Sequence, residues 1–330
     1  MYYISTMKNR TQPQLGKSEI IEQIRLACSN EPAAVEFMEQ QRWNGSPCCV
    51  HCGSKNVYKM VDAKTGQRSK RFLWRCHDCK EQYTVRIGSV YEETRLPLRH
   101  WVYAFWRAST SKKGVSALEI QRHCQISYKS ALFLMHRIRF ALAPGGGQKL
   151  KGLVELDETY VGGKVRPHPH RAGRPRKRGR GTRKVPVFAM VERDGGIHRR
   201  VVANVSAKTL RAALAESVDN RSVIVTDEFA TYAPIGRQFA GHEVVCHRNG
   251  EYVRDGWIHT NTAESSFAIL KRGITGIFHA VSKKHLPRYV GEFDFRWNTR
   301  RMNDGERTVA AIRSAEGKRL MYRESTQKAA

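Results

Sequence analysis

The spacing of hydrophobic positions changes along the chain, and these changes predict where helices and strands lie. Apolar residues at helical spacing predict helices within residues 1–42 and through most of 95–142. After residue 150 the apolar runs are short and lie between turn signals, which is typical of strands. Between these regions, the segment Ala143-Pro144-Gly145-Gly146-Gly147 predicts a linker, because proline and glycine end regular structure.

The segments after the linker predict a mixed α/β domain. Three strands come first, then a helix, a strand, a short helix, a strand and a longer helix. They are Leu153–Lys164 (a strand with its Gly-Gly turn), Val185–Val191, His198–Val205, Lys208–Val218, Ser222–Thr226, a short helix, His242–Cys246 and Thr260–Arg272. This order is that of a ribonuclease H-like domain, a mixed sheet covered by helices. In such a sheet Asp157 and Asp227 lie side by side.

Two Cys-x-x-Cys units provide the clearest local motif. Cys49-Val50-His51-Cys52 is followed by Cys76-His77-Asp78-Cys79, with two runs of strand type between them. Four thiolates on two tight turns form the tetrahedral ligand set of a structural Zn²⁺ site. The motif therefore predicts a zinc ribbon that binds Zn²⁺ through Cys49, Cys52, Cys76 and Cys79. The alternatives are free buried or redox-active cysteines, and a site in which His51 or His77 replaces one thiolate.

The helices of residues 95–142 include a possible DNA-reading unit. A helix over Ser116–His123 is followed by a short turn and a second helix over Tyr128–Leu142. Basic residues along the second helix, among them Lys129 and Arg137, favour a helix-turn-helix whose second helix enters the major groove. The alternative is an αα-hairpin that packs against the next domain.

The charge balance favours a polyanionic partner. Lys and Arg outnumber Asp and Glu by 58 to 30, a formal net charge of +28. Such a balance is typical of proteins that bind nucleic acid. No apolar run approaches the ~20 residues that span a bilayer, and no signal peptide is visible. We therefore expect a cytoplasmic, nucleoid-associated protein with no membrane partner, and cysteines that serve zinc rather than disulfides.

Residues 164–184 form the most basic stretch of the chain. They contain no acidic residue and are rich in Lys, Arg, Pro and Gly. Such a segment does not build a core, and it predicts a disordered cationic loop that binds phosphates. Within it, Arg174 and Arg176 fit an A·T-rich minor groove. The alternative is a solvated basic loop that is attracted to any duplex.

These observations divide the chain into successive units. The units are an N-terminal helical arm (1–42), a zinc ribbon (43–92), a helix-turn-helix region (93–143), a linker (144–150), a ribonuclease H-like catalytic domain (151–280) and a C-terminal helical extension (281–330).

Three carboxylates of the predicted α/β domain form its candidate active site. Asp157 lies in a buried apolar strand, where an unpaired charge costs on the order of several kcal/mol. Asp227 ends the strand beside it, and Glu264 lies near the start of a later helix. Two aspartates and a glutamate form an oxygen-rich ligand set that suits Mg²⁺ (or Mn²⁺) and two-metal phosphoryl transfer. Lys271 shares the helix face of Glu264, so Lys271 and its neighbour Arg272 are predicted DNA contacts.

Several segments together resemble one known family. They are Asp157-Glu158-Thr159-Tyr160-Val161-Gly162-Gly163-Lys164, Thr226-Asp227, His259-Thr260-Asn261-Thr262-Ala263-Glu264-Ser265 and Leu270-Lys271-Arg272-Gly273. With the ribbon and the helix-turn-helix, residues 35–312 resemble insertion-sequence transposases of the DDE type, in the branch with an N-terminal zinc ribbon.

The resemblance implies an activity and the residues that perform it. It implies Mg²⁺-dependent cleavage at the ends of a DNA element and strand transfer into target DNA, with Asp157, Asp227 and Glu264 as catalytic residues. In some relatives another residue fills the third position, and Asn261, one turn before Glu264, is then the alternative. Synapsis of two ends implies a homodimer or a higher oligomer on double-stranded DNA.

Two other functional classes compete with a transposase. One is a sequence-specific DNA-binding regulator with an inactive nuclease-like domain, which would not need intact carboxylates at all three positions. The other is a nuclease acting on RNA or on repair intermediates. The ribbon and the helix-turn-helix favour duplex DNA instead, because A-form RNA hides its major groove. The sequence therefore predicts a transposase.

Overall fold

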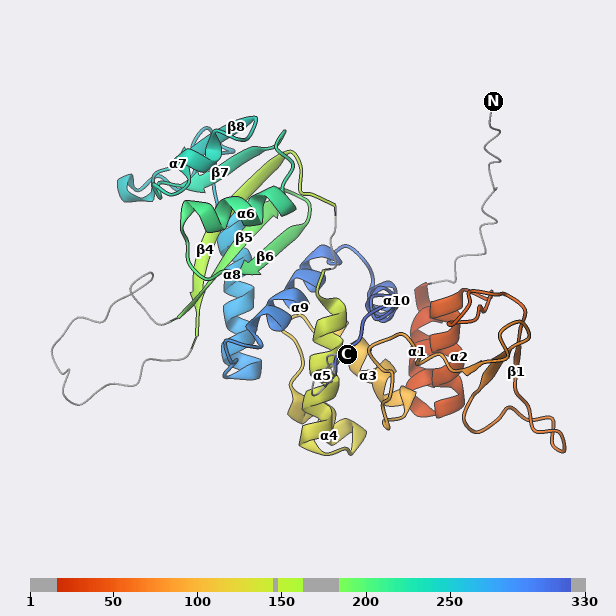
Figure 1. Cartoon of the computed structure of the whole chain (residues 1–330). Helices are drawn as coiled ribbons and strands as arrows, with labels where there is room; N and C mark the ends of the chain where they lie inside the picture. Colours follow the sequence, from red (N-terminus) through yellow and green to blue (C-terminus); the bar gives the residue numbers. More distant parts are fainter. Residues whose placement is uncertain (1–16, 145–147, 163–183, 322–330) are drawn as a thin grey trace, which may run out of the picture.

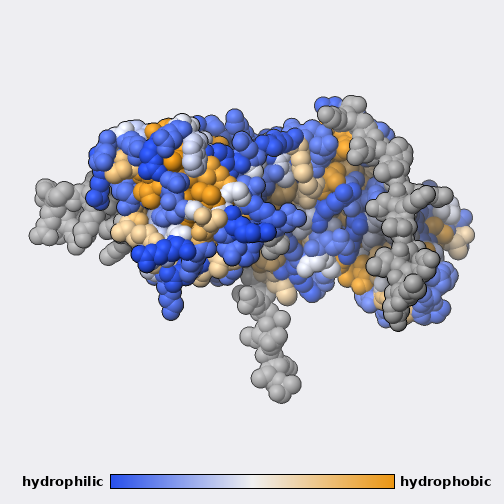
Figure 2. All heavy atoms as spheres, turned by 90° about the horizontal axis from the view of Figure 1, so that it is seen from above, coloured by the Kyte–Doolittle hydropathy of each residue, from blue (hydrophilic) through white to orange (hydrophobic). Residues whose placement is uncertain are grey.

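The computed structural model describes residues 17–144, 148–162 and 184–321 of the 330-residue chain. Figure 1 shows a large sheet with helices at one end of an elongated molecule and the zinc-ribbon strands near the other end. Helices from both halves of the chain lie between them. In Figure 2, seen from above, hydrophilic side chains cover most of the visible face and apolar patches interrupt it. No helix among the described residues combines the length and apolar character needed to cross a membrane.

The N-terminal part combines helices with a small sheet. Its elements are α1 (Lys17–Ser29), α2 (Glu31–Trp43), β1 (Val57–Lys59), β2 (Trp74–Cys76), β3 (Gln82–Tyr83), α3 (Leu98–Thr110), α4 (Ala117–Cys124) and α5 (Tyr128–Leu142). The three strands form an antiparallel sheet in the order β1-β2-β3, which is the predicted ribbon hairpin with one further strand. The C-terminal helix α10 (Asp304–Arg313) returns to this part and packs on α1, α2 and α3.

One hydrophobic cluster runs through the arm, the ribbon and the helices. It joins Met38 of α2, Trp74 of the ribbon, Trp101 of α3 and Ile312 of α10. Burying such side chains contributes roughly 1.5–3 kcal/mol each, so these segments stabilise one another. The boundaries proposed above between the N-terminal units stay a prediction, whereas the shared core is a property of the structure.

Local caps explain where the paired helices begin. The Ser116 side chain accepts a hydrogen bond from the Glu119 N–H at the start of α4, and Ser127 accepts one from Ser130 at the start of α5. Gln125 ends α4 in the left-handed conformation (φ 52°). The short turn between α4 and α5 therefore has the predicted position, and each of the two helices begins at a serine cap worth about 1 kcal/mol.

The large sheet has the strand order β6-β5-β4-β7-β8. Its strands are β4 (Leu153–Val161), β5 (Val185–Glu192), β6 (Ile197–Val201), β7 (Val223–Asp227) and β8 (Gly241–Val245). β4, β5 and β6 pair antiparallel, whereas β4, β7 and β8 run parallel. This is the mixed sheet of a ribonuclease H-like domain, so the predicted fold class is confirmed.

Helices cover both faces of the sheet. α6 (Ala207–Ser217) and the short α7 (Ala233–Gly236) lie on one face, where Val154 and Leu156 point. α8 (Asn261–Gly273) and α9 (Leu286–Asn298) cover the other face together with Val161. Because strand residues alternate between faces, Glu155 and Asp157 belong to the side of α8, and Glu158 belongs to the side of α6.

A buried ion pair connects the two halves of the molecule. Arg139 on α5 donates to Glu292 on α9 over 2.7 Å, and both side chains are almost completely buried. Glu292 also accepts from Arg296, which in turn donates to the Ala108 carbonyl of α3. The second half of α5 is therefore packed against α9.

Candidate functional site

The four predicted zinc ligands lie together. The sulfur atoms of Cys49, Cys52, Cys76 and Cys79 are all within 4.8 Å of one another. The Cys49–Cys79 and Cys52–Cys76 distances are 3.6 and 3.7 Å. For tetrahedral Zn²⁺ with Zn–S bonds of ~2.3 Å, two sulfurs stand about 3.8 Å apart. Donor type, number and spacing therefore all fit structural zinc, and this described cluster includes neither His51 nor His77.

Tight turns of the backbone hold the thiols in place. The N–H of His51 points at the sulfur of Cys49, and the N–H of Asp78 points at that of Cys76, both over 3.4 Å. Hydrogen bonds from the backbone N–H groups of Cys79 and Asp78 and from the thiols of Cys52 and Cys79 lower the pKa of Cys76 to about 7, whereas burial and the neighbouring thiols raise that of Cys79. Donors that favour the thiolate are what a metal ligand requires.

The first two carboxylates are neighbours in the sheet. The pairing of β4 with β7 ends at Glu155 and Val225; continuing the same register by two residues brings Asp157 level with Asp227, whose charge acts on Asp157. Each accepts a backbone hydrogen bond, Asp157 from Glu158 at 2.7 Å and Asp227 from Phe229 at 3.1 Å. Within the described part of the chain, no Lys or Arg forms an ion pair with either.

The electrostatics of Asp157 are those of a carboxylate among other carboxylates. Burial and, after it, the negative charges of Glu158, Asp227 and Glu264 together raise its pKa to about 8, against the opposing effect of the hydrogen bond from the Glu158 N–H. These charges act on Asp157 because the carboxylates are close in a poorly solvated place. A divalent cation would favour the ionised forms, so the cluster fits a hard metal ion bound by oxygen.

Glu264 lies on the same face of the sheet as Asp157, but its carboxylate is turned toward His247. It projects from α8, its side chain is 53 % exposed, and its Oε1 lies 3.8 Å from Nε2 of His247. Among the residues that the structure describes, the four cysteines are the group whose ligand atoms all lie within 4.8 Å, and the carboxylate trio is wider. Asn261 is exposed one turn earlier on α8. Which of the two completes the ligand set therefore stays a prediction.

The adjacent carboxylates have other contacts. Glu158 accepts a hydrogen bond from the Tyr232 hydroxyl at 2.7 Å, on the opposite face of the sheet from Asp157. Glu228 accepts the backbone N–H of His247 at 2.9 Å. Glu158 and Glu228 therefore form hydrogen bonds with groups other than the Asp157–Asp227 pair.

A buried residue that the sequence analysis missed lies beside the site. Glu155 is completely buried in β4, two residues before Asp157 on the same face. It binds Arg193 and the first N–H groups of α8, the helix that carries Glu264. Its position inside an apolar strand was the available signal, since a carboxylate there needs partners.

The predicted DNA contacts fall into different environments. Lys129 is exposed in the first turn of α5, and Lys271 and Arg272 are exposed near the end of α8. Arg137 is 7 % exposed, donates to the Glu92 carbonyl at 2.6 Å and lies over the Trp101 ring. A guanidinium held in this way does not face a groove of DNA, so the prediction for Arg137 is wrong in this structure. Arg174 and Arg176 lie outside the described residues.

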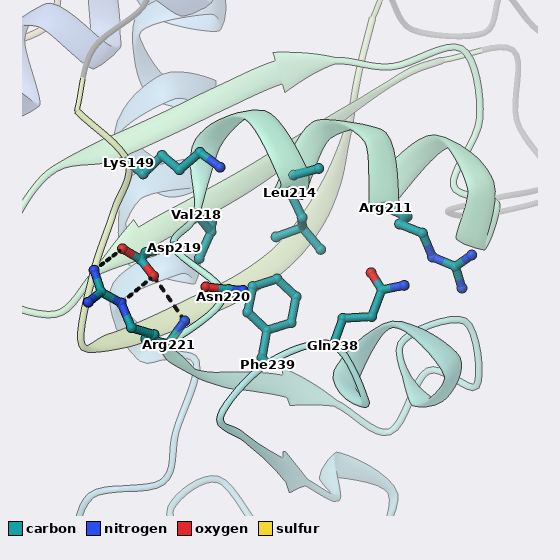
Figure 3. A pocket seen from close by; sticks show the side chains of 10 residues that line it. Lys149, Arg211, Leu214, Val218, Asp219, Asn220, Arg221, Gln238 and Phe239 are labelled. Carbon is teal, nitrogen blue, oxygen red and sulfur yellow. Dashed lines mark hydrogen bonds and ion pairs between the residues drawn. The ribbon is translucent and has the colours of Figure 1, made fainter.

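One cavity lies at the end of the strands opposite to the end that carries the carboxylates. It has a volume of about 590 Å³. Figure 3 shows the side chains of α6 and of the segments before β7 and β8 around it, with Asp219 paired to Arg221. Asp227 stands at the other end of β7, so this cavity is separate from the carboxylate site.

Comparisons with known proteins agree with this architecture. Residues 149–298 match the ISXO2-like transposase domain of the IS1595 family, and residues 29–82 match the transposase zinc-ribbon domain. A protein of the transposable element ISH50 from Halobacterium salinarum is 31 % identical over 280 residues, which cover 81 % of this chain and 90 % of that protein. A solved Mos1 transpososome is 12 % identical over 63 % of this chain and 76 % of that one, with a TM-score of 0.21, too low to support an argument.

Proposed function

Because the chain belongs to the IS1595 family of ISXO2-like transposases, we propose that it cleaves DNA at the ends of its element and joins them to target DNA. The observation that carries this proposal is the Asp157–Asp227 pair, which adjoining parallel strands bring together without a basic partner in the described chain. The pKa of Asp157, raised by burial and by three nearby carboxylates, supports a site built to receive divalent cations.

In the proposed reaction, a water oxygen forms a bond to phosphorus and the bond to the 3′ oxygen breaks. The freed 3′-hydroxyl then attacks a phosphodiester of the target by the same exchange. Two Mg²⁺ or Mn²⁺ ions, when bound, would stabilise the attacking and the leaving oxygens. Asp157, Asp227 and Glu264 would hold these ions, Asp157 contacting both and the other two one each. Asn261 replaces Glu264 in this role if Glu264 does not reach the metals.

Basic residues near the carboxylates would hold the DNA. Lys271 is exposed on α8, seven residues after Glu264 and on the same helical face, with Arg272 next to it. Lys129 is exposed at the start of α5, the part of a recognition helix that reads bases. The second half of α5 instead packs on α9, so only its first turns are available for this role. Binding two ends at once would require at least a dimer.

The zinc ribbon is proposed to be structural. Four cysteines would close the coordination sphere of Zn²⁺, leaving no position for water or substrate. Trp74 and Tyr83, buried beside the cysteines, belong to the core that α2, α3 and α10 share. Zinc would therefore stabilise the N-terminal half and keep its DNA-facing helices in place.

The test is an Asp227→Asn variant in a cleavage assay on DNA that carries the flanking ends of the gene. We expect loss of Mg²⁺-dependent cleavage with unchanged affinity for the ends. Asp219→Asn is the matched control, because Asp219 precedes the same strand at the opposite edge and pairs with Arg221. Retained cleavage by Asp227→Asn would contradict the assignment, and end-specific binding without any cleavage by the wild type would favour the regulator.

A further inference from the structure

Helix α8 begins without the capping side chain that its own sequence would normally supply. Thr260 occupies the cap position, and its side chain makes no capping hydrogen bond. The free N–H groups at a helix start need acceptors, and a carboxylate is the acceptor that the helix dipole favours most. Here the acceptor comes from another element, because Glu155 of β4 reaches across to the start of α8.

Both carboxylate oxygens of Glu155 accept hydrogen bonds. Oε2 accepts the backbone N–H of Thr262 at 2.8 Å and that of Ala263 at 3.1 Å. Oε1 accepts the Thr262 hydroxyl at 2.9 Å and two N–H groups of Arg193, at 2.8 and 3.1 Å. Arg193 in turn donates to the carbonyls of Trp257 and His259, which lead into α8. Glu155 is 0 % exposed, so these bonds form out of competition with water.

This network connects two parts of the proposed metal site. Glu155 lies two residues before Asp157 on the same strand face, and Ala263, which it binds, immediately precedes Glu264. The distance between Asp157 and Glu264 therefore depends on the hydrogen bonds by which Glu155 of β4 fixes the start of α8. A shift of the helix by one N–H group would move Glu264 by ~1.5 Å along the axis, enough to spoil metal geometry.

We propose that Glu155 is a positioning residue that, with Arg193, fixes the start of α8 and thereby holds Glu264 in place for the metal site. This inference rests on the proposed function, since it assumes that Asp157 and Glu264 share that site. Glu155 itself contacts neither metal nor DNA in this account. Its role is to set the position of a ligand, as outer partners of metal ligands commonly do.

The first experiment compares Glu155→Gln with Glu292→Gln. The amide keeps the shape of the side chain, but one of its two ends is an NH2 donor, so it cannot accept from both the N–H groups of α8 and those of Arg193. Glu292 is the matched control, because it is also fully buried and binds arginines, but it lies at the α5–α9 contact. Both variants are studied below their melting temperatures by Mn²⁺ titration calorimetry and by hydrogen exchange at Thr262 and Ala263.

We expect Glu155→Gln to bind Mn²⁺ about tenfold to a hundredfold more weakly and to exchange the two amides faster. Glu292→Gln should retain the wild-type Mn²⁺ affinity and amide protection. If Glu155→Gln does not fold, the Arg193→Lys variant is used instead, because it keeps the positive charge but removes the two-pronged contact with Glu155. We expect it to bind Mn²⁺ more weakly than the wild type, but by less than Glu155→Gln does.

Faster exchange with unchanged Mn²⁺ affinity would overturn the proposal, because Glu155 would then be merely structural. Equal losses of affinity in Glu155→Gln and Glu292→Gln would overturn it as well. The proposed function fails separately, in the wild type, if the unchanged protein neither binds Mn²⁺ nor cleaves DNA. In that case the exchange data still report whether Glu155 seats the helix.

Discussion

The two candidate metal sites of this protein are built in different ways. The four cysteines come from two tight turns around one small sheet, and their sulfurs already lie 3.6–3.7 Å apart in the pairs that face each other. The carboxylates come from β4, β7 and α8, and Glu264 stands apart from the pair formed by Asp157 and Asp227. The first arrangement is closed and local, whereas the second is assembled from distant segments.

Under the proposed function, this difference separates a site that stabilises the fold from one that performs chemistry. Ligands that local turns hold in a closed tetrahedron contribute to folding but offer no open position. Ligands on separate elements can admit substrate, but their geometry depends on the register of the sheet and on the seating of α8. Damage to the first site should therefore appear as lost stability, and damage to the second as lost rate.

The largest expected effect is on the cysteine site. Cys76→Ser, or removal of zinc by a chelator, should unfold the N-terminal half, because structural zinc contributes roughly 10–16 kcal/mol of apparent folding free energy in small zinc domains. Fluorescence of Trp43 and Trp74, which lie edge to face in this core, would report the unfolding. Cys48→Ser is the matched control, since Cys48 lies outside the cluster and should leave the transition unchanged. A stable, zinc-free Cys76→Ser protein would contradict the comparison.

The next effect concerns the connection between the two regions. Arg139→Met leaves the buried Glu292 with Arg296 alone, and breaking a buried pair from one side costs about 3–5 kcal/mol. We expect a lower midpoint in denaturant unfolding and two separated transitions, one for each half. Arg300→Met, at an exposed arginine over Trp297, should change the midpoint little. A single transition at the wild-type midpoint would show that the ion pair does not join the halves.

The third effect concerns the choice between Glu264 and Asn261. Loss of a group that stabilises charge in the transition state slows reactions by about 10²- to 10³-fold. We expect this loss of single-turnover cleavage rate for Glu264→Gln and a change within a few fold for Asn261→Ala. The reverse result would assign the third position to Asn261.

The smallest effect is on DNA binding at α8. Lys271→Ala should weaken binding about equally for all sequences and reduce the slope of log affinity against log salt by about 1, as expected for one lost phosphate contact. Binding measured at several salt concentrations checks this, with Lys208→Ala on α6, across the sheet, as the comparison. A sequence-dependent loss at Lys271 would indicate base contact instead.

Local patterns predicted much of this molecule. The Cys-x-x-Cys units identified the cysteine cluster because each unit forms its own turn. The order of strands and helices in the sheet followed from strand-length apolar runs and turn signals, including the short helix before β8. Parallel pairing of β4 with β7 then made Asp157 and Asp227 neighbours.

The failures come from contacts between segments far apart in the chain. Arg137 reads as a basic residue on a recognition helix, but Trp101 and the Glu92 carbonyl bury it. Glu155 was passed over because its partners, Arg193 and the start of α8, are separated from it by whole elements. Helical or strand spacing shows which face a residue occupies, but not which distant group covers that face.

The central claim is that Asp157 binds the metal ions that support cleavage. An Asp157→Cys variant tests it most directly, because a thiolate binds the hard Mg²⁺ poorly and softer divalent ions better. We predict that the variant cannot cut DNA carrying the element ends in Mg²⁺ but recovers part of its cleavage in Mn²⁺, with end binding unchanged. Wild-type cleavage by the variant in Mg²⁺ would contradict the account.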